Sequence, residues 1–281
     1  MPGPDPLAAL AARPAVVDAV AQARQACTEL RWHPALRRRT AEVRTESCVR
    51  AAAASAELDG VRLPLAQVRA MVAPAPLSGQ SSARPDRTGT VSAAEGRGPV
   101  DAVDAVVRGS LRATLDTFDL ARGLDRAPAQ ALARLHALAA ADLVGAAGTD
   151  LLGRPVPGAA ARVVSLVRLL AGGTQAPGLV VAALAEAELT TTAAFVPAGG
   201  VVARALARTV VVASGLDPHG VVVPERHALL DRSGREAALA GYAAGTTEGV
   251  EAWVAWWGRA VVAGAGHARR VADEVMAGRL A

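Results

Sequence analysis

Residues 193–204 read A-A-F-V-P-A-G-G-V-V-A-R, and this stretch decides how the rest of the chain is interpreted. Apolar, helix-forming runs lie on either side of it, at residues 179–192 and 201–214, and the Pro-Ala-Gly-Gly segment at residues 197–200 interrupts the helical pattern between them. A turn that opens directly onto a helix presents unpaired backbone N–H groups at the positive end of the helix dipole. The stretch therefore predicts a site for an anion.

Three residues would hold this anion. Gly199 and Gly200 supply the N–H groups of the turn, and Arg204 lies one turn into the following helix. A guanidinium group in that position grips a phosphate or a carboxylate through two parallel hydrogen bonds. The pattern predicts a small nucleotide- or anion-binding site made of these three residues.

The same stretch resembles the signature loop of Fic-domain proteins, which have the Fido fold: His-Pro-Phe-x-(Asp/Glu)-Gly-Asn-Gly-Arg-x-x-Arg. Phe195, Gly200 and Arg204 match this signature, whereas the positions of its catalytic histidine and its metal-binding acid hold Ala193 and Pro197. The Pro, the first Gly, the Asn and the first Arg of the signature are replaced by Ala194, Ala198, Gly199 and Val201. The loop resembles that of the family in shape, but its chemical groups are missing.

The resemblance extends over residues 131–277 and implies a Fido-like helical bundle. The segments that carry it are, in chain order, Leu135-His136, Gly153-x-Pro155, residues 176–192, Gly215-Leu216-Asp217-Pro218, Arg235 with Tyr242, and a closing helix rich in tryptophan. The gap between Arg235 and Tyr242 is longer than in the Arg-x-x-Tyr pattern of the family.

A second match lies upstream of the bundle. Residues 55–60, Ser-Ala-Glu-Leu-Asp-Gly, resemble the inhibitory motif of the family, (Ser/Thr)-x-x-x-Glu-(Gly/Asn). In that family the inhibitory acid pairs with the second arginine of the signature, so the resemblance implies a latch made of Ser55, Asp59, Gly60 and Arg204. The plainer interpretation is that Ser55 and Gly60 are ordinary helix-end residues.

The resemblance is to enzymes that transfer AMP from ATP to a hydroxyl group. In them the signature histidine accepts the proton of the hydroxyl and the acid holds Mg²⁺ on the nucleotide phosphates. Ala193 accepts no proton and Pro197 binds no metal. We therefore expect no catalytic residue and no metal ligand, and ATP with Mg²⁺ is implied as a cofactor by the resemblance alone.

Arg204 has two interpretations. In the first it is a semi-buried arginine that pairs with Asp59 and holds an N-terminal helix on the core. In the second it is a residual phosphate ligand beside Gly199 and Gly200. Both interpretations remain open at the level of sequence, although the loss of the other phosphate ligands favours the first.

The composition narrows the classes of function. The 281 residues contain no Ile, Lys or Asn, all 30 basic residues are arginine, and the net charge is only +4. A GC-rich bacterial genome explains these absences, which also exclude any P-loop or Schiff-base lysine. Cys27 and Cys48 lack metal-site spacing and indicate ordinary thiols in a reducing compartment. No signal peptide or membrane span is evident, so we expect a cytoplasmic protein.

Helical periodicity predicts an all-α protein, with a Fic-like core at residues 100–281, an N-terminal helical part at 1–73 and a mobile, Pro- and Gly-rich linker at 74–99. A small β-hairpin is expected in the turn-rich residues 148–158. Helices are expected at about residues 15–30, 40–58, 65–71, 100–122, 128–145, 159–171, 179–192, 201–214, 234–244 and 250–276. In the last of them, three tryptophans share one face and are expected in the core: Trp253, Trp256 and Trp257.

Three functions remain as hypotheses. The first is a degenerate Fic-fold protein without adenylyl transfer that acts by binding, with an unknown protein partner, or by regulation. The second is an active nucleotidyl transferase or nucleotide-binding enzyme that uses atypical residues around Gly199, Gly200 and Arg204. The third is an unrelated helical DNA- or protein-binding module that uses the arginines of residues 31–39 as its contact. The run Arg37 to Arg39 usually marks a solvated helix face, so nucleic-acid binding is the less favoured outcome.

Overall fold

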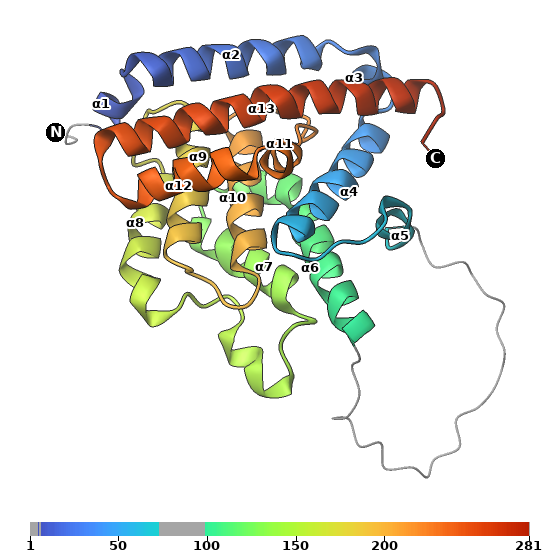
Figure 1. Cartoon of the computed structure of the whole chain (residues 1–281), viewed down its shortest axis with the longest axis horizontal. Coiled ribbons are helices and arrows are strands. Elements are labelled where there is room, and N and C mark those ends of the chain that lie inside the picture. The colour runs from blue at the N-terminus through green and yellow to red at the C-terminus, as the bar shows by residue number, and fades with distance from the viewer. Residues whose placement is uncertain (1–4, 6, 73–98, 281) are drawn as a thin grey trace.

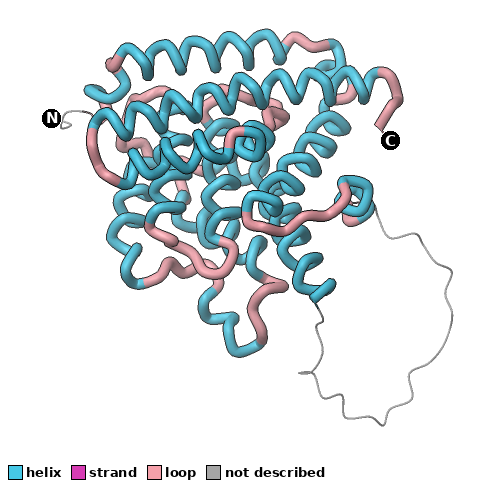
Figure 2. The backbone as a smooth tube through the Cα atoms, in the orientation of Figure 1, coloured by secondary structure: helices cyan, strands magenta, loops and turns pink. Residues whose placement is uncertain are grey.

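The computed structural model describes residues 5, 7–72 and 99–280, and this part of the chain consists of helices and loops without a strand (Figures 1 and 2). The all-α prediction is confirmed. The α-helices are α1 (Ala8–Ala11), α2 (Pro14–Arg31), α3 (Pro34–Arg38), α4 (Thr40–Leu58), α5 (Leu65–Ala70), α6 (Pro99–Leu120), α7 (Pro128–Ala140), α8 (Ala160–Leu170), α9 (Gly178–Thr191), α10 (Gly199–Ala213), α11 (Pro224–Leu230), α12 (Arg232–Ala243) and α13 (Thr247–Met276). Three short 3₁₀ helices are η1 (Ala121–Gly123), η2 (Ala146–Leu151) and η3 (Pro157–Ala159).

The long helix α13 crosses one side of the bundle, with α2 along it on the outside and α11 and α12 beneath it (Figure 1). The pair α9 and α10 forms the centre, and α10 also packs against α6 and α7. Helix α4 lies beside α6 and reaches α11 and α13. The loop between α9 and α10, which contains residues 193–198 of the stretch quoted above, thus lies at the end of the bundle away from α13 (Figure 1).

The tryptophan face of α13 fixes this long helix on the bundle. Trp253, Trp256 and Trp257 are all buried, as predicted. Each indole N–H has a partner: the carbonyl of Ala183 at 2.7 Å, Asp231 Oδ2 at 2.9 Å and Glu186 Oε2 at 2.9 Å, respectively. Large aromatic surfaces stabilise a core by burial, and their polar N–H groups must be paired there.

Helix α9 is apolar over most of its surface, which suits its place among α2, α8, α10, α12 and α13. Ten of its residues are buried. Since so little of this helix faces solvent, its own sequence does not say which neighbours it contacts. It carries the chain through the centre of the bundle to the start of the loop.

The expected hairpin at residues 148–158 is wrong. The structure has η2 and η3 there, joined by a left-handed turn at Gly153, where φ is +78°. Pro155 and Pro157 lack backbone N–H groups, so this short segment cannot complete a strand ladder. Helices α1, α3 and α11 were not predicted, since four, five and seven residues are too few to show a helical period. The other helices lie close to their predicted ranges.

Residues 1–73 and 100–281 were predicted to be separate parts. In the structure Val16, Ala23 and Leu30 of α2 belong to the same hydrophobic core as α9, α10 and α13. A smaller cluster joins Val49 and Ala52 of α4 to α5 and α6. The predicted linker at 74–99 falls outside the described residues, except that α6 begins at Pro99.

Within residues 5, 7–72 and 99–280, none of the helices combines the length and the apolar character needed to cross a lipid bilayer.

Candidate functional site

The loop between α9 and α10 has an unusual backbone. Ala193 and Ala198 both have positive φ angles, 45° and 66°. Ala198 is the N-cap of α10 and is in the left-handed conformation, which costs a non-glycine residue about 1–3 kcal/mol. Glycine would adopt this conformation at lower cost, so the fold holds Ala198 in a backbone shape that its own side chain disfavours.

Arg204 extends from the first turns of α10 to the end of α4. Its Nε donates to Ser55 Oγ at 2.8 Å, and its Nη2 donates to the Ser55 carbonyl at 2.9 Å and to Asp59 Oδ1 at 2.8 Å. Arg204 is only 6% exposed, whereas the Asp59 side chain is 28% exposed. The expected contact between these residues, which lie far apart in the sequence, is therefore present in the fold.

The carboxylate of Asp59 lies directly against the start of α10. A Cβ atom placed on Gly200 would lie 2.5 Å from Asp59 Oδ1 and 3.0 Å from Arg204 Nη1, closer than packed atoms approach. Gly199, by contrast, has open space at the same position. Gly200 is thus required for the approach of Asp59, and the negative charge at the positive end of α10 comes from the chain itself.

Gly60 follows Asp59 directly after the end of α4. Its φ of +87° is the left-handed conformation that commonly follows a helix, as the sequence predicts. The candidate residues therefore form one cluster, in which the end of α4 faces the start of α10: Ser55, Asp59, Gly60, Gly199, Gly200 and Arg204.

His136 on α7 ties the loop to the bundle. Its Nδ1 accepts the N–H of Gly153 at 3.0 Å, so the ring proton is on Nε2, which donates to the Pro197 carbonyl at 3.1 Å. The imidazole is buried and stacks at a tilt on Phe195. Burial lowers the pKa of His136, although the bond to Pro197 opposes this. His136 is therefore a neutral support of the loop with both nitrogens engaged.

Glu186 and Glu188 of α9 point to different sides, as their spacing predicts. Glu186 is buried and pairs with Arg235 of α12 at 2.7 Å, in addition to its bond from Trp257. Glu188 faces a more open edge, where Arg162 binds both of its oxygens at 2.7 Å and Tyr242 donates its hydroxyl to Oε1. Both carboxylates are thus fully engaged by other helices.

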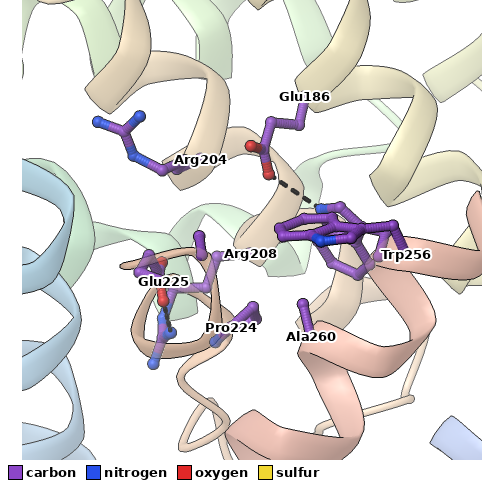
Figure 3. A pocket seen from close by; sticks show the side chains of 9 residues that line it. Glu186, Arg204, Arg208, Pro224, Glu225, Trp256 and Ala260 are labelled. Atoms are coloured by element: carbon purple, nitrogen blue, oxygen red, sulfur yellow. Dashed lines mark hydrogen bonds and ion pairs between the residues drawn. The ribbon is translucent and has the colours of Figure 1, made fainter. Parts of the chain in front are cut away.

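A cavity of about 20 Å³ lies between α9, α10, α11 and α13, with Glu186, Arg208, Glu225 and Trp256 among its lining residues (Figure 3). This volume has room for about one water molecule. Arg208 donates to two carbonyls of the loop before α11 and lies 3.7 Å from Glu225 Oε2. Burial raises the pKa of Glu225, against the effect of the Arg208 guanidinium. In Figure 3 the guanidinium of Arg204 points away from this cavity.

Sequence reasoning missed the buried pair of Arg208 and Glu225. One signal was available, since Arg208 follows Arg204 by one helical turn and shares its buried face. Nothing in the sequence indicated that the short helix α11 would bring Glu225 to that face.

Models of protein families give no match to this sequence, and neither do the curated proteins to which it was compared.

Proposed function

We propose that this chain is a degenerate Fic-like protein that acts by binding another protein or by regulation, and that it does not transfer nucleotides. One observation carries this proposal. The carboxylate of Asp59, held by Arg204, occupies the N-terminal end of α10, where the anion predicted from the loop sequence would bind. A phosphate group and this carboxylate repel each other and compete for the same guanidinium.

The residues of the loop support the same proposal. The methyl group of Ala193 cannot accept a proton, and Pro197 carries no carboxylate for Mg²⁺. His136 is the histidine that contacts the loop, but its two nitrogens are engaged by Gly153 and Pro197 and its pKa is lowered. It is therefore a poor substitute for the missing general base.

Titration calorimetry with ATP and Mg²⁺ tests the blocked site. We expect no binding to the wild-type loop at millimolar ATP and weak binding to Asp59→Ala, because that change leaves Arg204 and the N–H groups of α10 without their internal anion. The double variant Asp59→Ala/Gly200→Ala should lose this weak ATP binding, because a methyl group on residue 200 narrows the space through which the phosphate approaches the N–H groups of α10. Asp18→Ala, which removes an exposed carboxylate elsewhere, is the control.

Labelled ATP incubated with protein and cell lysate tests the absence of transfer. We expect no labelled product from the wild type or from Asp59→Ala. Transfer by the wild type that disappears in Asp59→Ala/Gly200→Ala or in a folded Arg204→Gln variant would overturn the proposal and favour an active transferase with atypical residues.

A further inference from the structure

A second site lies outside the loop, in a pocket of about 300 Å³. It is formed by the last turns of α4, the segment before α5, and one face each of α11 and α13. Four basic side chains from these elements line it: Arg50, Arg62, Arg226 and His267. Glu57 is the acidic residue in the lining. A volume of this size accommodates a small metabolite.

The positive charges of the pocket are only partly balanced. The backbone N–H of Arg226 donates to the carbonyl of Val223, but within the described residues its exposed guanidinium has no hydrogen bond or ion pair. Arg62 is 81% exposed and lies 3.7 Å from Glu57, too far for a hydrogen bond. Arg50, in contrast, is held by Glu46 and Glu274. The guanidinium of Arg226, and that of Arg62 in its long ion pair with Glu57, can thus turn toward a ligand.

His267 supplies a donor that the protein does not use. Its Nδ1 lies 3.4 Å from Arg270 Nη2, which can only donate, so the ring proton is on Nε2. That Nε2 is buried and has no partner. A buried N–H group without an acceptor costs about 1–3 kcal/mol, and a ligand oxygen would remove this cost.

The electrostatic environment of His267 is also positive. The pKa of His267 is lowered to about 4, mainly by burial and then by the charges of Arg50, Arg270 and Arg226, which outweigh the opposite effect of Glu274. The ring is therefore neutral near pH 7 and surrounded by cations. An anion bound in the pocket would oppose the positive potential at the His267 ring.

We propose that this pocket binds a small phosphate monoester, with the phosphate held by Arg62 and Arg226 near the His267 side chain. A phosphate dianion matches two guanidinium groups and an N–H donor better than a carboxylate does, because it has more charge and three acceptor oxygens. Leu63, Leu65 and Leu229 provide an apolar wall for the organic part of the ligand. This site goes beyond the proposed function and does not use Arg204.

Calorimetry with phenyl phosphate tests the site, with phenol and inorganic phosphate as probes of its two halves. We expect binding of phenyl phosphate at millimolar concentration or tighter, and weaker binding of each half. Arg226→Gln and Arg62→Gln should each weaken the binding about tenfold or more, the usual effect of losing one charge-assisted hydrogen bond. Both arginines are exposed, so neither change threatens folding.

Arg168→Gln on α8 is the matched control, because this arginine is exposed and does not line the pocket. NMR titration of the histidines gives a second readout, in which the His267 pKa rises when phenyl phosphate is bound. Absence of binding at millimolar phenyl phosphate would overturn the proposal. If Arg168→Gln weakened the binding of phenyl phosphate equally, the proposal would also be overturned, since the ligand would then be attracted to a basic surface in general. An unchanged His267 pKa in the bound protein would overturn it as well.

Discussion

Asp59, Gly200 and Arg204 form the smallest unit that carries the proposed function. Arg204 is buried and its charge must be compensated, and Asp59 supplies the compensation at 2.8 Å. Gly200 is needed because the carboxylate lies where a side chain would begin. The three residues are therefore coupled, and a change in one alters the effect of a change in another.

A double-mutant cycle tests this coupling. Gly200→Ala alone should destabilise the protein by about 1–3 kcal/mol, because the new methyl group displaces the carboxylate from Arg204. In the Asp59→Ala background the same change should cost clearly less. Urea unfolding of the four proteins measures the interaction energy, which we expect at about 0.5–3 kcal/mol. Additive effects of the two substitutions would show that Asp59 does not lie against Gly200.

At the scale of elements, close approach of helices decides which glycines of α13 are required. A Cβ on Gly258 would lie 2.8 Å from the Cβ of Ala19 on α2, so these two helices meet there with no room for a side chain. Gly266, on the same helix, has open space at its Cβ position and is exposed. The two glycines are equivalent in sequence terms but not in packing.

This difference predicts opposite effects on stability. Gly258→Ala should destabilise the protein by about 1–3 kcal/mol, because the methyl group forces α2 and α13 apart. Gly266→Ala should stabilise it by about 0.5–1 kcal/mol, because alanine loses less conformational entropy in a helix. Thermal or urea unfolding of both variants provides the comparison. A loss of stability in Gly266→Ala comparable to that in Gly258→Ala would contradict the packing described.

For the whole molecule, burial of histidines contributes to the response to acid. The pKa values of His136, His219, His227 and His267 are all lowered, with burial as the largest cause. Below about pH 6.5 the unfolded chain takes up protons that the folded protein does not, so these groups stabilise the fold above that pH and the stabilisation is lost as the pH falls. The raised pKa of Glu225 acts in the opposite direction.

His267 provides the clearest test of this pH dependence, because its pKa of about 4 in the folded protein defines the pH range over which stability is lost. The wild type should lose more stability between about pH 7 and about pH 5 than His267→Gln does, since the variant lacks this proton uptake on unfolding. Urea unfolding at both pH values gives the two differences. Equal differences in the two proteins would contradict the assigned pKa.

Sequence patterns predicted the parts of this protein that depend on local physics. Helical periodicity located most helices, and the three tryptophans of α13 were predicted to lie in the core, because a shared apolar face has few alternatives to burial. The break at residues 197–200 marked the loop. The expected pairing of Asp59 with Arg204 came from a family resemblance, and the structure contains the contact, although the family itself remains a proposal.

Tertiary structure alone decided what surrounds these parts. The carboxylate over Gly200, the double anchoring of His136 and the basic pocket at His267 each combine residues from helices that are distant in the chain. No local pattern encodes such distances, since they depend on how several helices pack at once. The sequence by itself determined a helical chain with a broken, potentially anion-binding loop. Only the packing of α4 against α10 decided that the protein's own Asp59 occupies it.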